Sequence, residues 1–309
     1  MRLISWNVAS VRARLPRVLE LLEDLRPDAL ALQETKCAPA QIPREALAEA
    51  GYAVVDHSGG PWNGVAILAP VGTVAGTPAA GATPLPEGTG GAAASVDAAT
   101  GTTAITDPGG RASGEPDPWG GPRAGLPGEV DPAQARWVEA TVGGIRVASV
   151  YVVNGKALDH PDYEAKLSFL RAMGERVREL AATGPVMVLG DMNVCPTDED
   201  CWDPARFVGS THTSEPERAS WRGILEAADL VDAHVHHGSA RADGVDGKNA
   251  FTWWDYRGGS FHRGFGLRID HALVDRATAS RVSSVWVARD YRKGHKPSDH
   301  APLVVDLDG

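Results

Sequence analysis

The spacing of hydrophobic and polar residues predicts short β-strands separated by a few amphipathic helices. Apolar residues recur at helical spacing in residues 14–26, 161–181 and 218–231. Alternating or short apolar runs predict strands at residues 2–8, 27–35, 52–55, 64–69, 136–142, 145–153, 186–189, 250–254, 268–274, 282–287 and 301–307. Because strands run through both halves of the chain with helices between them, we expect an α/β protein with mixed sheets.

Residues 77–123 break this pattern. They consist mainly of Gly, Ala, Pro and Thr with scarcely an aliphatic side chain, and such a segment buries too little apolar surface to offset its ordering entropy. The strand before this segment and the hairpin after it are expected to belong to the same fold, so the segment is not a domain boundary. We therefore expect a single domain over residues 1–309, with a mostly disordered insertion at about residues 77–123. A solvated surface loop is favoured there over a lid that touches substrate.

Composition and charge narrow the class of protein. The chain has 309 residues, 43% of them hydrophobic and 23% charged, and a net charge of −10, which is ordinary for a globular protein. The negative charge argues mildly against a sequence-independent nucleic-acid coat protein but not against an enzyme that contacts nucleic acid locally. The first residues predict no secretory signal, and no run is long and apolar enough for a membrane span. The cysteines Cys37, Cys195 and Cys201 form no pattern, so we expect a cytoplasmic protein with reduced thiols.

Polar residues stand at or near the ends of many predicted strands. They are Asn7, Gln33, Glu34, Lys36, Tyr151, Asn154, Asp191, Asn193, Asp270, Ser298, Asp299 and His300. Any one of them alone would be read as a cap or turn residue. Their repetition predicts that neighbouring strand ends converge on one pocket containing acids and a histidine.

This set of side chains suits hydrolysis of a phosphodiester. Divalent cations such as Mg²⁺ bind oxygen ligands, and Glu34 is the natural one, with Asn7 and Asp299 in support. The reaction also needs an aligned water and neutralised phosphoryl charge. Asp191 can align or deprotonate the water while Asn193 fixes its direction. His300, donating one ring proton to Asp270, would present its other nitrogen to a phosphate oxygen.

Six short motifs, taken together in this order, resemble the exonuclease III family of DNA-repair nucleases: "SWN", "LQETK", "GDMN", "FTWWDYR", "GLRID" and "PSDHAP". The likeness covers residues 1 to about 307 except the insertion. The resemblance implies a four-layer sandwich, in which two mixed, mostly antiparallel sheets pack face to face between helices. It implies cleavage of double-stranded DNA 5′ to abasic sites and 3′-to-5′ exonuclease action, with Mg²⁺ or Mn²⁺, by a monomer without a membrane partner.

The resemblance also assigns roles to residues. It makes Glu34 the principal metal ligand, supported by Asn7 and Asp299, and gives the catalytic roles to Asp191, Asn193, Asp270, His300 and Tyr151. It assigns substrate contacts to Lys36, Asn154, Trp253, Trp254, Leu267, Arg268 and Ile269. Among these, the two tryptophans, Leu267 and Ile269 correspond to an apolar pocket for a flipped-out abasic sugar, which is the cheapest nucleotide to extrude because its base is missing.

Ala9 departs from the family pattern, which usually has Asn or Asp two residues after Asn7, so one oxygen donor is missing. Two alternatives remain: a phosphatase or phospholipase of the same fold that acts on a small or lipid phosphate, and a non-catalytic DNA-binding relative. The complete set of acids and the histidine counts against the non-catalytic relative. The "WWDYR" aromatic stretch and the repair-type motifs favour a nucleic-acid substrate. An oligonucleotide with one abasic analogue would separate all three.

Overall fold

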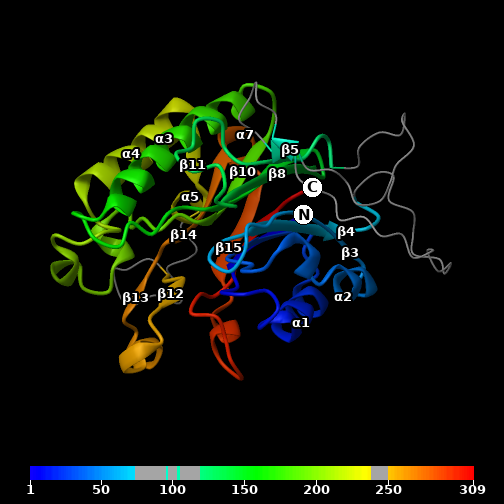
Figure 1. Cartoon of the computed structure of the whole chain (residues 1–309), viewed down its shortest axis with the longest axis horizontal. Helices are drawn as coiled ribbons and strands as arrows, with labels where there is room; N and C mark the ends of the chain where they lie inside the picture. The colour runs from blue at the N-terminus through cyan, green and yellow to red at the C-terminus, as the bar shows by residue number, and fades with distance from the viewer. Residues whose placement is uncertain (74–94, 97–102, 105–118, 238–249) are drawn as a thin grey trace.

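The computed structural model describes residues 1–73, 95–96, 103–104, 119–237 and 250–309. Within these ranges, two large sheets face each other and helices cover their outer faces (Figure 1). The first sheet has the order β15-β16-β1-β2-β4-β3. Its strands are β1 (Arg2–Asn7), β2 (Ala29–Gln33), β3 (Tyr52–His57), β4 (Val65–Pro70), β15 (Val282–Val287) and β16 (Leu303–Leu307).

The second sheet has the order β11-β14-β10-β9-β8-β7-β6-β5. Its strands are β5 (Ser95–Val96), β6 (Thr103–Ala104), β7 (Arg123–Ala124), β8 (Trp137–Val142), β9 (Ile145–Tyr151), β10 (Val186–Asp191), β11 (Leu230–Asp232) and β14 (Asp270–Asp275). A small separate ribbon pairs β12 (Trp253–Trp254) with β13 (Gly266–Leu267). The pairs β1–β2 and β9–β10 are parallel and the other pairs are antiparallel, so both large sheets are mixed.

Helices complete the outer layers. They are α1 (Leu15–Leu25), α2 (Arg44–Glu49), α3 (Pro161–Ala181), α4 (Glu215–Ala227), α5 (Ala233–His237), α6 (Ser260–Arg263) and α7 (Arg276–Ala279). Short 3₁₀ turns lie at η1 (Pro39–Gln41), η2 (Asp198–Asp200), η3 (Pro204–Phe207), η5 (Arg257–Gly259) and η6 (Arg289–Arg292). The α3 and α4 side chains pack on the outer face of the second sheet, and those of α1 pack on the outer face of the first.

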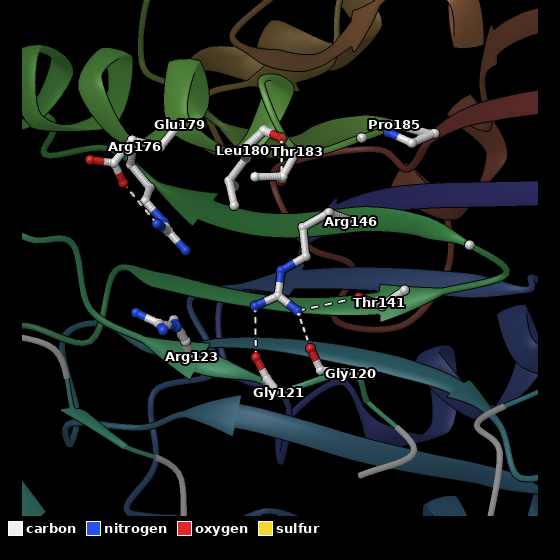
Figure 2. A pocket seen from close by; sticks show the side chains of 12 residues that line it. Gly120, Gly121, Arg123, Thr141, Arg146, Arg176, Glu179, Leu180, Thr183 and Pro185 are labelled. Carbon is white, nitrogen blue, oxygen red and sulfur yellow. Dashed lines mark hydrogen bonds and ion pairs between the residues drawn. The ribbon is translucent and has the colours of Figure 1, made fainter. Parts of the chain in front are cut away.

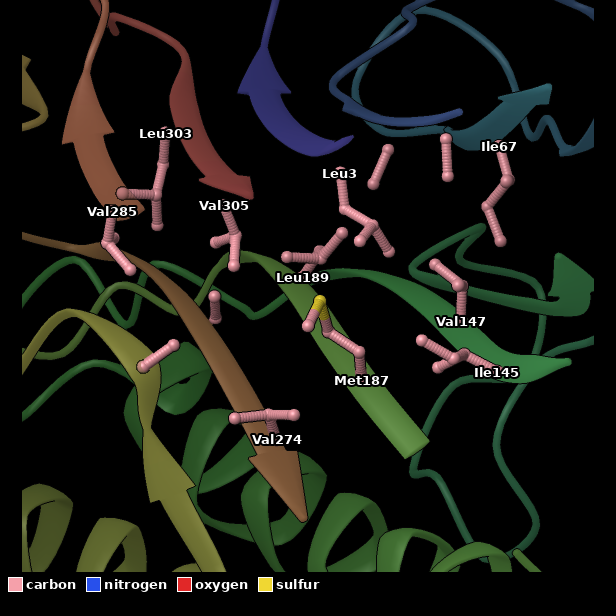
Figure 3. Close-up of a cluster of buried hydrophobic side chains, with 14 of the residues drawn as sticks. Leu3, Ile67, Ile145, Val147, Met187, Leu189, Val274, Val285, Leu303 and Val305 are labelled. Carbon is pink, nitrogen blue, oxygen red and sulfur yellow. The ribbon is translucent and has the colours of Figure 1, made fainter. Parts of the chain in front are cut away.

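The main hydrophobic core lies between the two sheets. Leu3, Ile67 and Val305 from the first sheet meet Val147 and Met187 from the second (Figure 3). Strands buried on one face by the opposite sheet and on the other by helices explain why the sequence shows apolar runs as well as alternation. The predicted four-layer sandwich is confirmed.

Two predicted elements differ from the structure. The helix expected at residues 218–231 begins earlier, because Ser214 and Glu217 form a capping box, and it ends at Ala227. Asp229 then adopts a left-handed φ of 47°, and β11 pairs with β14 instead of continuing the helix. The strand expected at residues 250–254 is reduced to Trp253–Trp254.

Most of the insertion lies outside the described residues. Its described end is part of the second sheet: Thr141 N donates to Trp119 O (2.8 Å), and Arg146 donates to Gly120 O (3.0 Å) and Gly121 O (2.8 Å). These contacts border a pocket of about 540 Å³ near the β8–β9 turn, seen in Figure 2. For residues 119–123, therefore, sheet contacts replace the expected disorder.

No helix in the described ranges is both long and apolar enough to cross a lipid bilayer.

Candidate active site

Five strand ends converge on one edge of the sandwich. In the second sheet, Asp191 is directly opposite Tyr151 on one side and Asp270 on the other. Gly190 permits this, because a Cβ there would lie 2.0 Å from Val150 O. In the first sheet, β1 and β2 end side by side at Asn7 and Gln33. The two sheets thus bring together the polar cluster, defined here as Asn7, Glu34, Asp191, Asp270 and His300.

Asn7 links the acids of the two sheets. Its Nδ2 donates to Glu34 Oε1 (2.8 Å) and to Asp191 Oδ2 (2.9 Å), while its Oδ1 accepts from Ala9 N (3.0 Å). The Asn7 side chain is fully buried, and all of these groups are satisfied. Asn7 therefore fixes the position of Glu34 relative to Asp191.

Glu34 remains ionised despite its burial. Burial raises its pKa, but the Lys36 ammonium, with which it forms an ion pair, and the hydrogen bond from Asn7 lower it below the ordinary value overall. The neighbouring Tyr151 is hydrogen-bonded to Glu34, and burial together with the Glu34 and Asp191 charges raises its pKa well above the usual range. The Tyr151 phenol therefore stays protonated and acts as a hydrogen-bond donor at this edge.

Asp191, Asp270 and His300 form a chain of buried charges. His300 Nδ1 lies 2.8 Å from Asp270 Oδ2, and His300 Nε2 lies 3.7 Å from Asp191 Oδ2. Burial lowers the pKa of His300, but the charges of Asp270 and Asp191 outweigh it and raise the pKa to about 10. Burial raises the pKa of Asp191 to about 7, against the favourable effect of His300. At neutral pH the histidine is therefore an imidazolium.

Backbone strain concentrates at this edge. Ala9, Glu34, Lys36 and Asn193 have positive φ values of 48°, 52°, 50° and 51°, a conformation that costs an L-residue about 1–2 kcal/mol. Ala9 is the residue that departs from the family pattern, and Asn or Asp would tolerate this conformation better. Strained backbone that the surroundings enforce is common at functional sites.

Asn193 and Asn154 lie beside the polar cluster. Asn193 Oδ1 accepts from Asn154 Nδ2 (3.1 Å) and lies 3.1 Å from His212 Nε2. Burial, followed by the charge of Lys166, lowers the pKa of His212 to about 3. His212 is therefore neutral, with its Nε2 within hydrogen-bond distance of Asn193 Oδ1.

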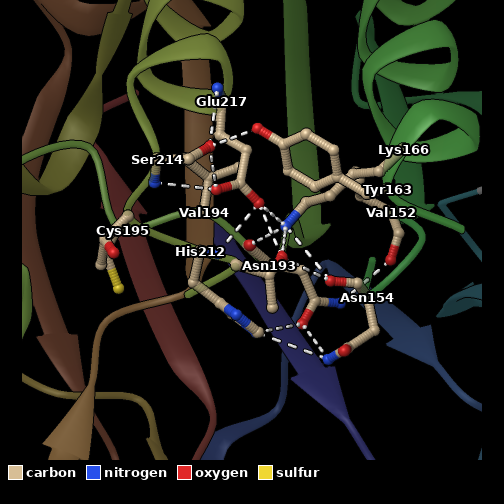
Figure 4. A network of polar contacts seen from close by, with 12 residues as sticks. Val152, Asn154, Tyr163, Lys166, Asn193, Val194, Cys195, His212, Ser214 and Glu217 are labelled. Carbon is tan, nitrogen blue, oxygen red and sulfur yellow. Dashed lines mark hydrogen bonds and ion pairs between the residues drawn. The ribbon is translucent and has the colours of Figure 1, made fainter. Parts of the chain in front are cut away.

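A buried ion pair supports the Asn193 turn from behind, as Figure 4 shows. Lys166 Nζ donates to Asn193 O (2.6 Å) and forms an ion pair with Glu217, and both side chains are fully buried. The sequence interpretation missed Lys166, Glu217 and His212. The signal for Lys166 was present, since it lies on the buried face of α3 with Tyr163 and Leu170.

The donor set fits a hard cation. Ligand atoms of Glu34, Asp191 and His300 lie within 4.8 Å of one another, and carboxylate oxygens are the donors that Mg²⁺ and Mn²⁺ prefer. Asp299 lies outside this group, because its Oδ2 accepts from Trp253 Nε1 (3.1 Å). Asn7 directs its N–H groups, not its oxygen, at the acids. Here Glu34 and Asp191 are the candidate metal-binding carboxylates.

Three of the four residues expected to form a small apolar pocket lie together. Leu267, Ile269 and the half-buried Trp253 cluster with the buried Cys195 and Cys201. The fourth, Trp254, is not part of this cluster.

Two residues assigned to substrate contact face inward instead. Trp254 is 2% exposed and packs edge-on against Phe261 in the core between the sheets. Arg268 is 1% exposed and pairs with Asp200 (2.6 Å) and Asp232 (2.6 Å). Consecutive residues of an extended segment point to opposite sides, so Arg268 faces away from its neighbours Leu267 and Ile269. Neither side chain is exposed to a substrate in this structure, so neither is carried into the proposed site.

Comparisons with known proteins agree with this geometry. Residues 4–300 match the Endonuclease/Exonuclease/phosphatase family. The chain is 28% identical to the exodeoxyribonuclease III of Haemophilus influenzae, covering 99% of this chain and 100% of that one. It is similar to the structure of the 3′ phosphatase NExo from Neisseria bound to a product DNA hairpin (33% identity, TM-score 0.77, all of both chains). An AP endonuclease from Archaeoglobus fulgidus matches at 26% identity and a TM-score of 0.76, over all of both chains.

The two-sheet sandwich with acids and a histidine at one edge defines a nuclease or phosphatase of the endonuclease/exonuclease/phosphatase type. Within that class, the chain belongs to the exonuclease III family.

Proposed function

We propose that this chain is a divalent-metal-dependent DNA-repair phosphodiesterase that cleaves DNA 5′ to abasic sites and removes nucleotides from 3′ ends. The observation that carries the proposal is the polar cluster, in which Asn7 joins Glu34 to Asp191 while His300 joins Asp191 to Asp270. Relatives named exodeoxyribonuclease III and AP endonuclease span the whole chain and support DNA as the substrate. We infer that the enzyme acts as a monomer.

Glu34 would hold Mg²⁺ or Mn²⁺, which when bound would supply positive charge to the phosphoryl oxygens and the leaving oxygen. Asp191 aligns the attacking water and accepts its proton, since a carboxylate whose pKa is about 7 suits general-base catalysis near neutral pH. Asn193 orients the same water.

His300 and Tyr151 act on the phosphoryl group. His300 holds its Nδ1 proton on Asp270 and donates from Nε2 to a phosphoryl oxygen, and its raised pKa keeps it charged through the reaction. Tyr151 donates from its phenol, and Asn154 contacts the phosphate beside it.

Substrate contacts follow from the remaining residues of this edge. Lys36, which pairs with Glu34, contacts a phosphate oxygen next to the metal. The cluster of Trp253, Leu267 and Ile269 receives the extruded abasic sugar, which is the easiest nucleotide to extrude because its base is missing. Asp299 accepts a hydrogen bond from the Trp253 indole and would add negative charge in support of the metal site.

The decisive experiment compares three substrates under three metal conditions. The substrates are a duplex with one abasic analogue, a duplex with a recessed or phosphorylated 3′ end, and an inositol phosphate. We expect cleavage of both DNA substrates with Mg²⁺ or Mn²⁺, none in EDTA, and none by Glu34→Ala with an unchanged circular dichroism spectrum. Full activity in EDTA would contradict the metal role. Turnover of the inositol phosphate alone would favour the alternative, a phosphatase of small or lipid phosphates.

A 3′ phosphatase is a second candidate activity, because a relative with that printed name is 33% identical over both whole chains. Relative rates on the abasic duplex and on the 3′-phosphorylated duplex distinguish an endonuclease from an enzyme that processes 3′ ends.

A further inference from the structure

Trp62 is the unusual side chain of the surface around the polar cluster. It is 81% exposed, whereas every other tryptophan in the described ranges is buried or half-buried. An indole offers a large flat apolar face, and a folded chain normally covers it. The Trp62 indole, in contrast, is exposed to solvent.

The backbone next to Trp62 is tightly held. Asn63 O accepts from Lys36 N (2.9 Å), Gly64 O accepts from Thr35 N (3.0 Å), and Gly64 N donates to Ala135 O (2.9 Å). Gly64 has a φ of 117°, and a Cβ there would lie 2.1 Å from Thr35 Oγ1. The loop is therefore pressed against the end of β2, and the indole is presented from a fixed base.

The loop backbone that carries Trp62 lies at the edge of the polar cluster. The residue after Trp62 shares a hydrogen bond with Lys36, whose ammonium pairs with Glu34. An exposed aromatic ring at the edge of a phosphate-binding site can stack on a base while the site holds the phosphate, as in proteins that bind a single nucleic-acid strand.

The surroundings of Trp62 argue against a protein partner. Its neighbours in the loop are Gly59, Gly60, Pro61 and the buried Asn63, so the loop itself adds no second large apolar side chain of the kind that protein interfaces need.

We propose that Trp62 is a base-stacking residue, which holds a DNA base next to the phosphate that is bound at the polar cluster. This inference rests on the proposed DNA function and adds a contact to it. A ring that stacks on any base tolerates every sequence. It binds an unpaired or terminal base best, because such a base already exposes one face. Trp62 thereby favours damaged sites and 3′ ends over continuous duplex.

The test compares Trp62→Ala, Trp62→Phe and Val235→Ala, which removes an exposed side chain from α5. DNA with 2-aminopurine beside an abasic analogue is titrated with each protein in EDTA, so that binding is measured without cleavage. We expect Trp62→Ala to weaken binding about tenfold, the middle of the range for one stacked base, and to lose the 2-aminopurine quenching. Trp62→Phe should retain most of both, and Val235→Ala should match the wild type.

Cleavage with Mg²⁺ provides a second readout. KM should rise in Trp62→Ala while kcat stays within about twofold, because the indole does not touch the reacting atoms. Unchanged binding and quenching in Trp62→Ala would overturn the inference even if the wild type cleaves DNA well. If the wild type cleaves no DNA but binds it with quenching that depends on Trp62, the stacking role stands and the proposed nuclease function fails.

Discussion

At the scale of single residues, the polar cluster and its neighbour Lys36 contain more acidic than basic side chains. Three carboxyl groups, those of Glu34, Asp191 and Asp270, gather here, and within the described ranges the cations that pair with them are His300 and Lys36. In the described part of the chain, Asp270 Oδ1 is buried without a hydrogen-bond partner. Burial, together with the charges of Asp270 and Glu34, raises the pKa of Asp191 to about 7. A divalent cation bound here would offset the negative charge.

Asp191→Asn tests the general base at this scale. The change keeps the shape of the side chain and removes its charge, so we expect kcat to fall about 10²–10⁴-fold, the usual loss for a removed general base. DNA affinity should stay the same or rise slightly, because a negative charge that faces phosphate has gone. Steady-state kinetics and binding in EDTA check both parts, with the exposed Asp229→Asn as control. A defect confined to KM would make Asp191 a binding residue.

His300 makes stability depend on pH. Its pKa is raised from the ordinary 6.5 to about 10 in the folded protein, so the stabilisation is fully present below about pH 6.5 and is lost as the pH rises towards 10. We expect the free energy of unfolding of metal-free protein to fall over this window, and to fall less in His300→Gln. Urea unfolding at pH 6, 8 and 10 measures it. Parallel curves for the two proteins would show that His300 is not charged in the folded state.

Ala9 gives a prediction on metal affinity. Ala9→Gly relieves the left-handed conformation (φ 48°) without adding an oxygen, whereas Ala9→Asp adds one. We expect both variants to unfold at a slightly higher temperature. Only Ala9→Asp should lower the Mg²⁺ concentration that gives half-maximal activity. If Ala9→Gly lowers it equally, strain, and not a missing donor, sets the metal requirement.

At the scale of elements, the site depends on helices that lie behind the polar cluster. Helices α3 and α4 pack together on the outer face of the second sheet and contribute Lys166 and Glu217 to a buried ion pair. Burial lowers the pKa of Lys166, and the charge of Glu217 opposes that shift. Through the hydrogen bond from Lys166 to Asn193 O (2.6 Å), helix packing is coupled to the position of the Asn193 turn.

Lys166→Met should therefore reduce both the free energy of unfolding and kcat. It leaves Glu217 buried without its partner, so we expect a loss of about 3–5 kcal/mol in the free energy of unfolding. It also loosens the Asn193 turn, so kcat should fall more than KM changes. The double variant Lys166→Met with Glu217→Gln should regain much of the stability but not the kcat. Recovery of both would show that the pair supports the fold alone.

At the scale of the whole molecule, each sheet supplies half of the site. Asn7 and Glu34 follow strands of the first sheet, and Tyr151, Asp191 and Asp270 end or begin strands of the second. The buried core between the sheets (Figure 3) fixes the separation of these groups. Any change that lets the sheets shift should therefore reduce activity before the protein unfolds.

The insertion can be tested by two deletions. Replacing residues 77–118 by a short Gly-Ser turn removes the low-complexity segment but keeps the residues that contact β8 and Arg146. We expect a change of about 1 kcal/mol or less, because loop-closure entropy depends only weakly on length. Extending the deletion to residue 122 removes acceptors of Arg146 and should cost more. Thermal unfolding compares them, and equal stabilities would show that the contacts of residues 119–122 are unimportant. Loss of DNA binding in the shorter deletion would show that the insertion touches substrate.

The sequence by itself determined the elements and the kinds of side chain at the site. Local periodicity placed α3 at residues 161–181 as the structure has it, because a long amphipathic helix is set by its own pattern. Most strands also follow from short apolar runs. Short motifs at strand ends identified Glu34, Asp191, Asp270 and His300, since acids beside buried strands stand out against their neighbours.

Tertiary structure decided which side chains face the site and what holds them there. Leu230 to Asp232 form a strand because β14 offers hydrogen bonds that outweigh helical preference. Arg268 turns inward because its partners, Asp200 and Asp232, come from distant segments, and Trp254 turns inward because it joins the core between the sheets. His212 and Lys166 meet Asn193 only after the helices pack. Periodicity reports contacts between near neighbours in the chain, whereas these contacts join residues far apart in it, so their geometry exists only in the folded molecule.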